Sequence, residues 1–292
     1  MNTIWSNYIQ GPKTLYYSRK LRFDDMFREQ YKVLFGLEEG KKLRILEIGG
    51  GPGALAGALH RWYPEAEITA IDRDSEFIAF AKEHEPGIRF MVGDATELPF
   101  EEGSFDVTIS NTVSEHIEPG VFYGEQLRVL KPGGVCLVLS ARKGIHVYAK
   151  CLAKRADEEA FWKKVEQYDD TMERYAVCKY PMSEAELPLA LQKHGFQKVS
   201  TGYATINLTP DHPAVSSDMA QAMINANRYT ALEAVDSVLR FMPGQITEEE
   251  CQAIKNIIEE KYNTRIEQYQ KGEKQWDTNV SITMVVRGEK TK

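Results

Sequence analysis

The chain has 292 residues, of which 42% are hydrophobic and 27% charged, and its formal net charge is −7. This composition is typical of a globular protein with one large α/β domain or two small ones, and the acidic balance argues against a nucleic-acid partner. Residues 1–7 lack the basic start and apolar segment of a signal peptide, and no apolar run reaches membrane-helix length, so we expect a cytoplasmic protein. The four cysteines are far apart and never form CxxC, so we expect neither a disulfide framework nor a metal site.

Short apolar runs alternate with helical stretches in the first half of the chain. Strands are predicted at 43–48, 67–71, 88–92, 105–110 and 135–140, and helices at 54–63, 75–84 and 121–130. Strands that alternate with helices indicate right-handed βαβ units and a mostly parallel sheet. The near-continuous apolar character of these strands indicates that helices cover both faces of the sheet.

The pattern becomes more helical after residue 140. Residues 141–180 are aromatic-rich and are predicted to be helical, and Ser183 with Glu186 forms a capping box that begins another helix. A sixth strand is predicted at 197–204 and a final strand at 280–286. Between them, apolar residues recur at helical spacing, and Thr247 with Glu250 caps a second helix there.

A glycine-rich turn, Leu46-Glu47-Ile48-Gly49-Gly50-Gly51-Pro52-Gly53-Ala54, joins the first strand to the first helix of the βαβ region. Glycines let a ligand approach the backbone closely, and the helix that follows presents free N–H groups at its start. Taken alone the turn is ambiguous, because Gly49, Gly51 and Ala54 also satisfy the dinucleotide-binding pattern GxGxxG/A.

Acidic residues at the ends of neighbouring strands distinguish between these ligands. Glu47 ends the first strand, Asp72 the second, and Asp94 follows the third. Ligands of open α/β sheets bind at the carboxyl ends of the strands. A carboxylate at position 47 would repel a pyrophosphate and attract a cationic amino group. S-adenosylmethionine carries an ammonium and a sulfonium and no phosphate, so it fits this pattern better than a dinucleotide.

Residues 45–140 resemble the core of the class I S-adenosylmethionine-dependent methyltransferases, in particular the small-molecule enzymes that include the ubiquinone and menaquinone C-methylases. The matching segments are 47–53, Ile71-Asp72, 93–100 (GDATELPF), 104–107 (SFDV) and 128–134 (RVLKPGG). The resemblance implies a Rossmann-like α/β fold with seven strands, the last antiparallel and inserted beside the sixth. It also implies S-adenosylmethionine as cofactor and S-adenosylhomocysteine as product.

The resemblance assigns a role to each matching position. Glu47, Gly49, Gly51 and Gly53 would hold the methionine part, Asp72 the ribose, Arg73 one side of the adenine, Asp94 and Ala95 the adenine edge, and Asn111 would lie beneath the sulfonium. A leading helix often lies over the cofactor in the related enzymes, so we add the hypothesis that Arg19 pairs with the methionine carboxylate.

Three regions are expected from these assignments. They are an N-terminal helical cap (1–40), a cofactor-binding core (41–206 and 279–292) with a helical insertion at 141–181, and a second helical insertion (207–278) that would serve as acceptor lid. The insertion at 207–278 replaces the short turn that is usual in the family, so the acceptor does not follow from the resemblance.

Methyl transfer by in-line displacement depends mainly on alignment, and a general base is needed only if the nucleophile arrives protonated. His116 is the nearest candidate base, His146 and Tyr16 have weaker support, and a local packing role for His116 is favoured. We therefore assign no catalytic residue. A small-molecule acceptor is favoured over RNA or protein. A nicotinamide-dependent oxidoreductase and a non-catalytic binding protein are the remaining alternatives, and the acceptor and the oligomeric state stay open.

Overall fold

The computed structural model describes residues 5–168, 174–175, 177–242 and 244–291. Within them, seven strands form one sheet in the order β3-β2-β1-β4-β5-β7-β6. The strands are β1 (Arg44–Ile48), β2 (Glu67–Asp72), β3 (Arg89–Val92), β4 (Phe105–Asn111), β5 (Leu130–Val147), β6 (Phe196–Leu208) and β7 (Thr278–Lys290). β7 runs antiparallel to its neighbours β5 and β6, and the other pairs are parallel. The predicted Rossmann-like α/β fold with an antiparallel last strand is confirmed.

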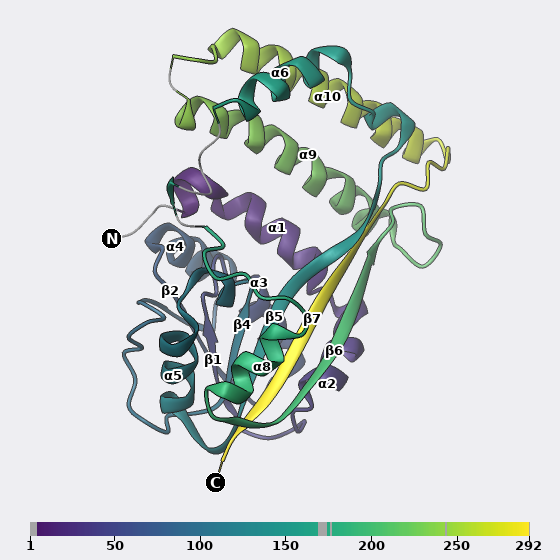
Figure 1. Ribbon diagram of the computed structural model, residues 1–292. Helices are drawn as coiled ribbons and strands as arrows, with labels where there is room; N and C mark the ends of the chain where they lie inside the picture. The colour runs from purple at the N-terminus through teal and green to yellow at the C-terminus, as the bar shows by residue number, and fades with distance from the viewer. Residues whose placement is uncertain (1–4, 169–173, 176, 243, 292) are drawn as a thin grey trace.

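Helices cover both faces of this sheet (Figure 1). One hydrophobic cluster joins the sheet to α1 (Pro12–Arg22), α2 (Arg28–Phe35), α3 (Ala54–Trp62) and α4 (Ser75–His84), and another joins it to α5 (Pro119–Val129) and α8 (Glu186–Lys193). Side chains alternate between the two clusters along a strand: in β1, Ile45 lies in the first and Leu46 and Ile48 in the second. This alternation places Glu47 on the same face as α3, beneath the turn that follows β1.

The strands β5, β6 and β7 extend well beyond the other four, which Figure 1 shows as a long ribbon rising from the sheet. The prediction that residues 141–181 form a helical insertion is wrong for 141–147, which continue β5. These residues pair with β7 from Ala141↔Thr283 to Val147↔Thr278, so a strand 130 residues later in the chain satisfies their backbone groups. A helix, α6 (Ala156–Glu166), follows further on, and residues 169–173 and 176 lie outside the described residues.

α6 packs with α9 (Ser217–Phe241) and α10 (Glu248–Gln270) into a helical layer at the top of Figure 1. The layer has its own hydrophobic cluster, which includes Phe161, Val165, Ile224, Val235, Val238, Ile254 and Ile258. The predicted capping boxes are confirmed: Thr247 and Glu250 bond reciprocally at the start of α10, and Ser183 and Glu186 at the start of α8. Of the predicted insertion 207–278, residues 207–208 belong to β6 and residue 278 to β7.

A short N-terminal segment, Trp5–Ile9, lies between α4 and the helical layer. The backbone N–H and hydroxyl of Ser6 donate to the buried carboxylate of Asp74, at 2.9 and 3.0 Å. The same carboxylate caps α4 by accepting from the Glu76 N–H. On the other side, Arg240 of α9 donates to the Asn7 carbonyl at 2.7 Å. The segment is therefore fastened both to the sheet domain and to the helical layer.

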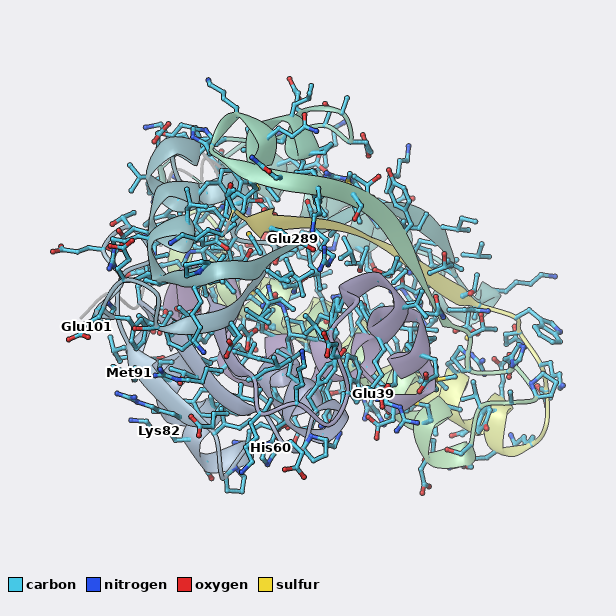
Figure 2. The ribbon with its side chains drawn as sticks, turned by 90° about the horizontal axis from the view of Figure 1, so that it is seen from below. Glu39, His60, Lys82, Met91, Glu101 and Glu289 are labelled. Atoms are coloured by element: carbon cyan, nitrogen blue, oxygen red, sulfur yellow. The ribbon has the colours of Figure 1, made fainter. Side chains whose placement is uncertain are left out.

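The periphery of the molecule carries charges of both signs. Figure 2, the view from below, shows Lys82 and Glu101 at its rim, and Glu39 is exposed as well. Among the helices of the described residues, none combines the length and the apolar character needed to cross a membrane.

Candidate functional site

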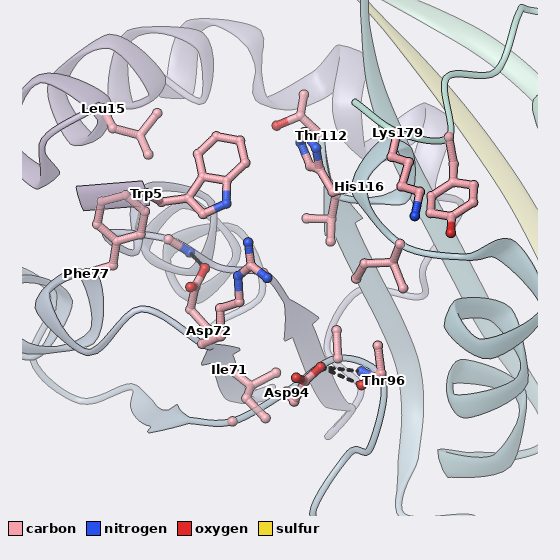
Figure 3. Close-up of a pocket in the computed structure, with 18 of the residues that line it drawn as sticks. Trp5, Leu15, Ile71, Asp72, Phe77, Asp94, Thr96, Thr112, His116 and Lys179 are labelled. Carbon is pink, nitrogen blue, oxygen red and sulfur yellow. Dashed lines mark hydrogen bonds between the residues drawn. The ribbon is translucent and has the colours of Figure 1, made fainter. Parts of the chain in front are cut away.

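A cavity of about 340 Å³ opens at the carboxyl ends of β1, β2, β3 and β4 (Figure 3). Its walls come from the glycine-rich turn (Gly49, Gly51), the end of β2 (Ile71, Asp72, Arg73), the loop after β3 (Gly93, Asp94, Ala95, Thr96) and the loop after β4 (Thr112, Val113, His116, Ile117, Glu118). The N-terminal elements add Trp5, Leu15 and Arg19, α4 adds Phe77, and a later loop adds Lys179 and Tyr180. The volume and the mixture of apolar walls with a few polar groups are typical of a small-molecule site.

The glycine-rich turn has a backbone that other residues adopt poorly. Gly49, Gly51 and Gly53 have φ angles of 67°, 55° and 92°. A side chain on Gly49 would collide with Val113, and a Cβ on Gly53 would lie 3.0 Å from both Ala81 and Phe90. Gly49 and Gly51 line the cavity, whereas Gly53 is the N-cap of α3 and has a packing role.

Glu47 does not line the cavity and lies buried beneath the turn, with 1% of its surface exposed. Its Oε2 atom accepts no hydrogen bond from the described residues. Burial raises the pKa of Glu47 to about 8, the charge of Arg19 opposes this rise, and the charge of Asp72 adds to it. The fold therefore holds, directly behind the turn, a carboxyl group that a cation would stabilise in its ionised form.

Asp72 lines the cavity and organises the turn at the same time. Its Oδ2 accepts from the Gly51 N–H and its Oδ1 from the Asp74 N–H, each at 2.8 Å. Burial raises the pKa of Asp72, and these two hydrogen bonds oppose the rise. Each carboxylate oxygen can accept more than one hydrogen bond, so both remain able to accept from a ligand hydroxyl.

Asp94 lies at the lower end of the cavity in Figure 3, and the next residue, Ala95, also lines the cavity. Oδ1 of Asp94 accepts from the backbone N–H and the hydroxyl of Thr96, at 2.8 and 2.7 Å. These bonds fix the carboxylate at the cavity wall, while Oδ2 accepts no hydrogen bond from the described residues.

The structure places Arg19 and Arg73 in the cavity wall but keeps Asn111 behind it. Asn111 ends β4 with 9% of its surface exposed, and the next residue, Thr112, faces the cavity instead. Thr112 has a φ angle of 54°, uncommon for a residue other than glycine, and its hydroxyl accepts from the Arg19 guanidinium at 2.8 Å. Burial lowers the pKa of Arg19, with Glu47 opposing, yet a guanidinium remains protonated.

Of the candidate bases, only His116 reaches the cavity. Its Nδ1 accepts from the Cys178 N–H at 2.9 Å, and its ring meets the Trp5 ring edge-on with centroids 4.9 Å apart. Burial lowers the pKa of His116, Glu115 opposes this, and the charges of Arg73 and Arg19 lower it further. The imidazole is therefore neutral at pH 7, and since Nδ1 accepts, the proton is assigned to Nε2.

The other two candidates lie elsewhere. His146 stacks on Tyr148 and lines a separate, much smaller cavity near the end of β5. The hydroxyl of Tyr16 donates to Glu85 at 2.6 Å, and Tyr16 does not line the main cavity. Burial raises the pKa of Tyr16, and the bond to Glu85 adds to the rise. Neither side chain is placed to exchange a proton with a ligand of this cavity.

Several cavity residues were not predicted from the sequence, among them Trp5, Thr112, Lys179 and Tyr180. Thr112, Lys179 and Tyr180 lie in connecting segments and Trp5 begins a five-residue helix, so no long periodic pattern marks these positions. Thr112 directly follows the observed end of β4 at Asn111.

Comparisons with known proteins agree with this geometry. A family model described as "Methyltransferase domain" matches residues 46–138. A fatty-acid O-methyltransferase of Mycolicibacterium smegmatis is 41% identical over 108 residues, which cover 36% of this chain and 38% of that protein. A ubiquinone/menaquinone biosynthesis C-methyltransferase of Desulfotalea psychrophila is 34% identical over 99 residues, covering 33% and 40%. The matched part thus spans well under half of these relatives.

The fold as a whole is also found in a solved structure. A phosphoethanolamine N-methyltransferase 2 of Haemonchus contortus, in complex with S-adenosyl-L-methionine, superposes with a TM-score of 0.53 at 17% identity. The superposition covers 99% of this chain and 59% of that one. At this level of identity the likeness concerns the fold alone.

Proposed function

Because residues 46–138 belong to the methyltransferase domain family, we propose that the chain is an S-adenosylmethionine-dependent methyltransferase that acts on a small molecule. The observation that carries the proposal is the set of acids at neighbouring strand ends around one glycine turn. Glu47 lies behind the turn, Asp72 at its side and Asp94 at the far end of the same cavity. Carboxylates at Asp72 and Asp94 disfavour a dinucleotide pyrophosphate, and a bound ammonium would stabilise Glu47 in its ionised form.

The residues present fit the cofactor. The buried Glu47 carboxyl has an oxygen without a hydrogen-bond partner among the described residues. Its charge would stabilise an ammonium group bound on the other side of the glycine-rich turn, because the glycines there place no side chains between the two groups. The Arg19 guanidinium, which lines the cavity and carries no carboxylate partner within 4 Å in the described structure, would pair with the methionine carboxylate. Gly49 and Gly51 would give the ligand access to the backbone, and Gly53 would support the turn through its packing at the start of α3.

The adenosine part would occupy the other end of the cavity. Asp72 would accept from the ribose hydroxyls, using lone pairs that its bonds to Gly51 and Asp74 leave available. Asp94 and the Ala95 N–H would form hydrogen bonds with the adenine edge, and Arg73 would lie against one side of the ring. Asn111 would act only from behind the wall, beneath the sulfonium.

The cofactor, when bound, supplies a methyl group on a positively charged sulfur. As the acceptor's lone pair forms its bond to the methyl carbon, the carbon–sulfur bond breaks and its electron pair goes to sulfur. This chain's residues align the acceptor and exclude water. His116 holds the cavity wall by accepting from Cys178 and presents an N–H, so in this arrangement it does not accept a proton. We propose a positioning role for it.

The regions around the core would complete the site. We propose that residues 1–40 form a cap, since Trp5, Leu15 and Arg19 line the cavity. We propose that the insertion 207–278 acts as an acceptor lid on the core (41–206 and 279–292). The support is that α9 contacts the N-terminal segment: Glu233 accepts from the Gly11 N–H at 2.6 Å, and Arg240 donates to Asn7.

Calorimetry with S-adenosylhomocysteine tests the proposal. The parent should bind with a dissociation constant on the order of micromolar, and Asp72→Asn should bind about tenfold or more weakly, because one charged acceptor is lost. Asp218→Asn, an exposed acid in the first turn of α9, is the matched control and should bind like the parent. Equal affinity of the Asp72 variant and the parent, or binding of NAD in place of the nucleoside, would contradict the proposal.

A further inference from the structure

Cations line the cavity without close acidic partners. Arg19, Arg73 and Lys179 all belong to its wall, and no carboxylate oxygen lies within 4 Å of any of them among the described residues. Arg19 donates to the Thr112 hydroxyl, and the Lys179 ammonium lies 5.5 Å from the centre of the Tyr180 ring. The cofactor's single carboxylate accounts for one of these cations, Arg19. Arg73 and Lys179 remain.

The acids of the same wall are already engaged by backbone donors. Asp72 accepts from Gly51 and Asp74, Asp94 from Thr96, and Glu118 from the Val121 N–H at 2.8 Å, which caps α5. These bonds hold the carboxylates in place and away from the two cations. Arg73 and Lys179 therefore lie in the wall without an acidic partner among the described residues, although the cavity as a whole is lined by acidic and basic residues in similar number.

Lys179 lies at the end of the cavity away from the predicted adenine contacts. Figure 3 shows it on the same side as His116, with Asp94 and Asp72 across the cavity. The charges of Arg73 and Arg19 also act on His116 at this end, and Glu115 opposes them. Lys179 and Arg73 therefore contribute cations to the wall where the acceptor would meet the methyl group.

The backbone that carries Lys179 is fixed on both sides. The Cys178 N–H donates to His116 Nδ1, and the Tyr180 N–H donates to the Glu115 carbonyl at 2.8 Å. Cys178 has a φ angle of 55°, a conformation that costs a residue with a side chain on the order of 1 kcal/mol. A strained residue tied down beside a cavity is typical of functional sites, and here it directs Lys179 to the rim.

From these observations we propose that the methyl acceptor is an organic anion whose carboxylate or phosphate group binds at Lys179, at the His116 end of the cavity. The inference rests on the proposed function and adds the chemical class of the acceptor to it. Apolar walls formed by Val113, Ile117 and Tyr180 would contact the rest of the molecule.

The test uses ligands that differ only in charge. Calorimetry on the full chain saturated with S-adenosylhomocysteine would compare octanoate and octyl phosphate with uncharged octanamide, at constant ionic strength. We expect at least one anion to bind about fivefold more tightly than the amide, the ratio for one partly screened ion pair. The two anions distinguish a carboxylate acceptor from a phosphate acceptor.

Variants locate the effect. Lys179→Gln should abolish the preference for the anion, and Lys179→Arg should keep it, while both bind S-adenosylhomocysteine as the parent does. Lys82→Gln is the control, because Lys82 is an exposed lysine in the last turn of α4 and lies at the rim of the molecule in Figure 2. It should leave every affinity unchanged.

The outcomes separate the two claims. If S-adenosylhomocysteine binds but neither anion is preferred over octanamide, the inference is overturned and the proposed function stands. The inference is also overturned if the preference persists in Lys179→Gln. If S-adenosylhomocysteine itself does not bind, the proposed function fails, and the inference fails with it.

Discussion

At the scale of single residues, burial decides what each acid of the site does. Glu47, Asp72 and Asp94 occupy equivalent places at successive strand ends, yet their exposure differs widely. Asp94 is exposed, Asp72 is half-buried, and Glu47 is sealed behind the glycine turn. Burial raises the pKa of the sealed Glu47 to about 8, so its protonation is expected to change on ligand binding near neutral pH.

Glu47 gives a prediction about proton release. Since its pKa in the free protein is about 8, its carboxyl is protonated at pH 7. An ammonium bound nearby favours the charged form, so the pKa falls and about one proton should be released per S-adenosylhomocysteine at pH 7, and fewer above pH 8. Calorimetry at pH 7 in phosphate and in Tris measures this release. Glu47→Gln should release less, and equal release by variant and parent would contradict the assignment.

At the scale of elements, the sequence predicted the first half of the sheet well because each element there carries its own signal. The apolar runs of β1, β2 and β4 cover nearly the observed strands, and the capping box at Ser183 marks the start of α8. The extension of β5 was missed, because Arg142, Lys143 and Gly144 are polar or small and because the extension pairs with β7 only in the folded chain, with a register shift between Arg142 and Ile145. Long-range pairing of this kind leaves no local pattern.

The site was predictable to the same extent as the elements that carry it. Asp72, Asp94 and the glycines follow strand ends and were found from that position. Lys179 was missed because its place depends on backbone bonds from neighbouring residues to His116 and Glu115, which are distant in sequence. Asn111 was assigned a place beneath the sulfonium from the family resemblance, and it does not line the cavity. The left-handed turn at Thr112 brings the next side chain there instead.

The N-terminal segment gives an element-scale prediction. Ser6 ties this segment to Asp74, and Trp5 beside it lines the cavity. Removing the hydroxyl by Ser6→Ala should leave the cap of α4 intact and increase the dissociation rate of S-adenosylhomocysteine, measured by stopped-flow fluorescence. Asp74→Ala should also lower stability, by about 1 kcal/mol, through the lost cap.

Ser18→Ala is the matched control, because the Ser18 hydroxyl bonds only within its own helix, to the Leu15 carbonyl. It should change neither rate nor stability. If Ser6→Ala released the ligand at the parent's rate, the N-terminal segment would not retain the cofactor.

At the scale of the whole molecule, a buried ion cluster joins the helical layer to the extended strands. Arg265 of α10 is fully buried and donates to Asp277, before β7, at 2.7 Å and to Asp211, after β6, at 2.8 Å. Asp211 also accepts from the backbone N–H groups of Gln275 and Trp276. The cluster thus attaches the helical layer to the segments that follow β6 and precede β7.

Breaking this cluster should destabilise the protein strongly. Arg265→Met leaves two buried carboxylates without their cation and should lower the free energy of unfolding by about 3–5 kcal/mol in urea titrations. Lys271→Met removes an exposed partner of Glu267 and should change it by less than about 0.5 kcal/mol. A loss for Arg265→Met no larger than that of the control would show that the cluster does not hold the layer.

The central claim is that acids at adjacent strand ends and one glycine turn form a site for a sulfonium nucleoside. A crystal structure of the protein grown with S-adenosylhomocysteine tests it most directly. We predict the ribose against Asp72, the adenine edge at Asp94 and Ala95, and the amino group over the turn that covers Glu47. A cavity without the nucleoside at saturating concentration, or the nucleoside bound outside this cavity, would contradict the account.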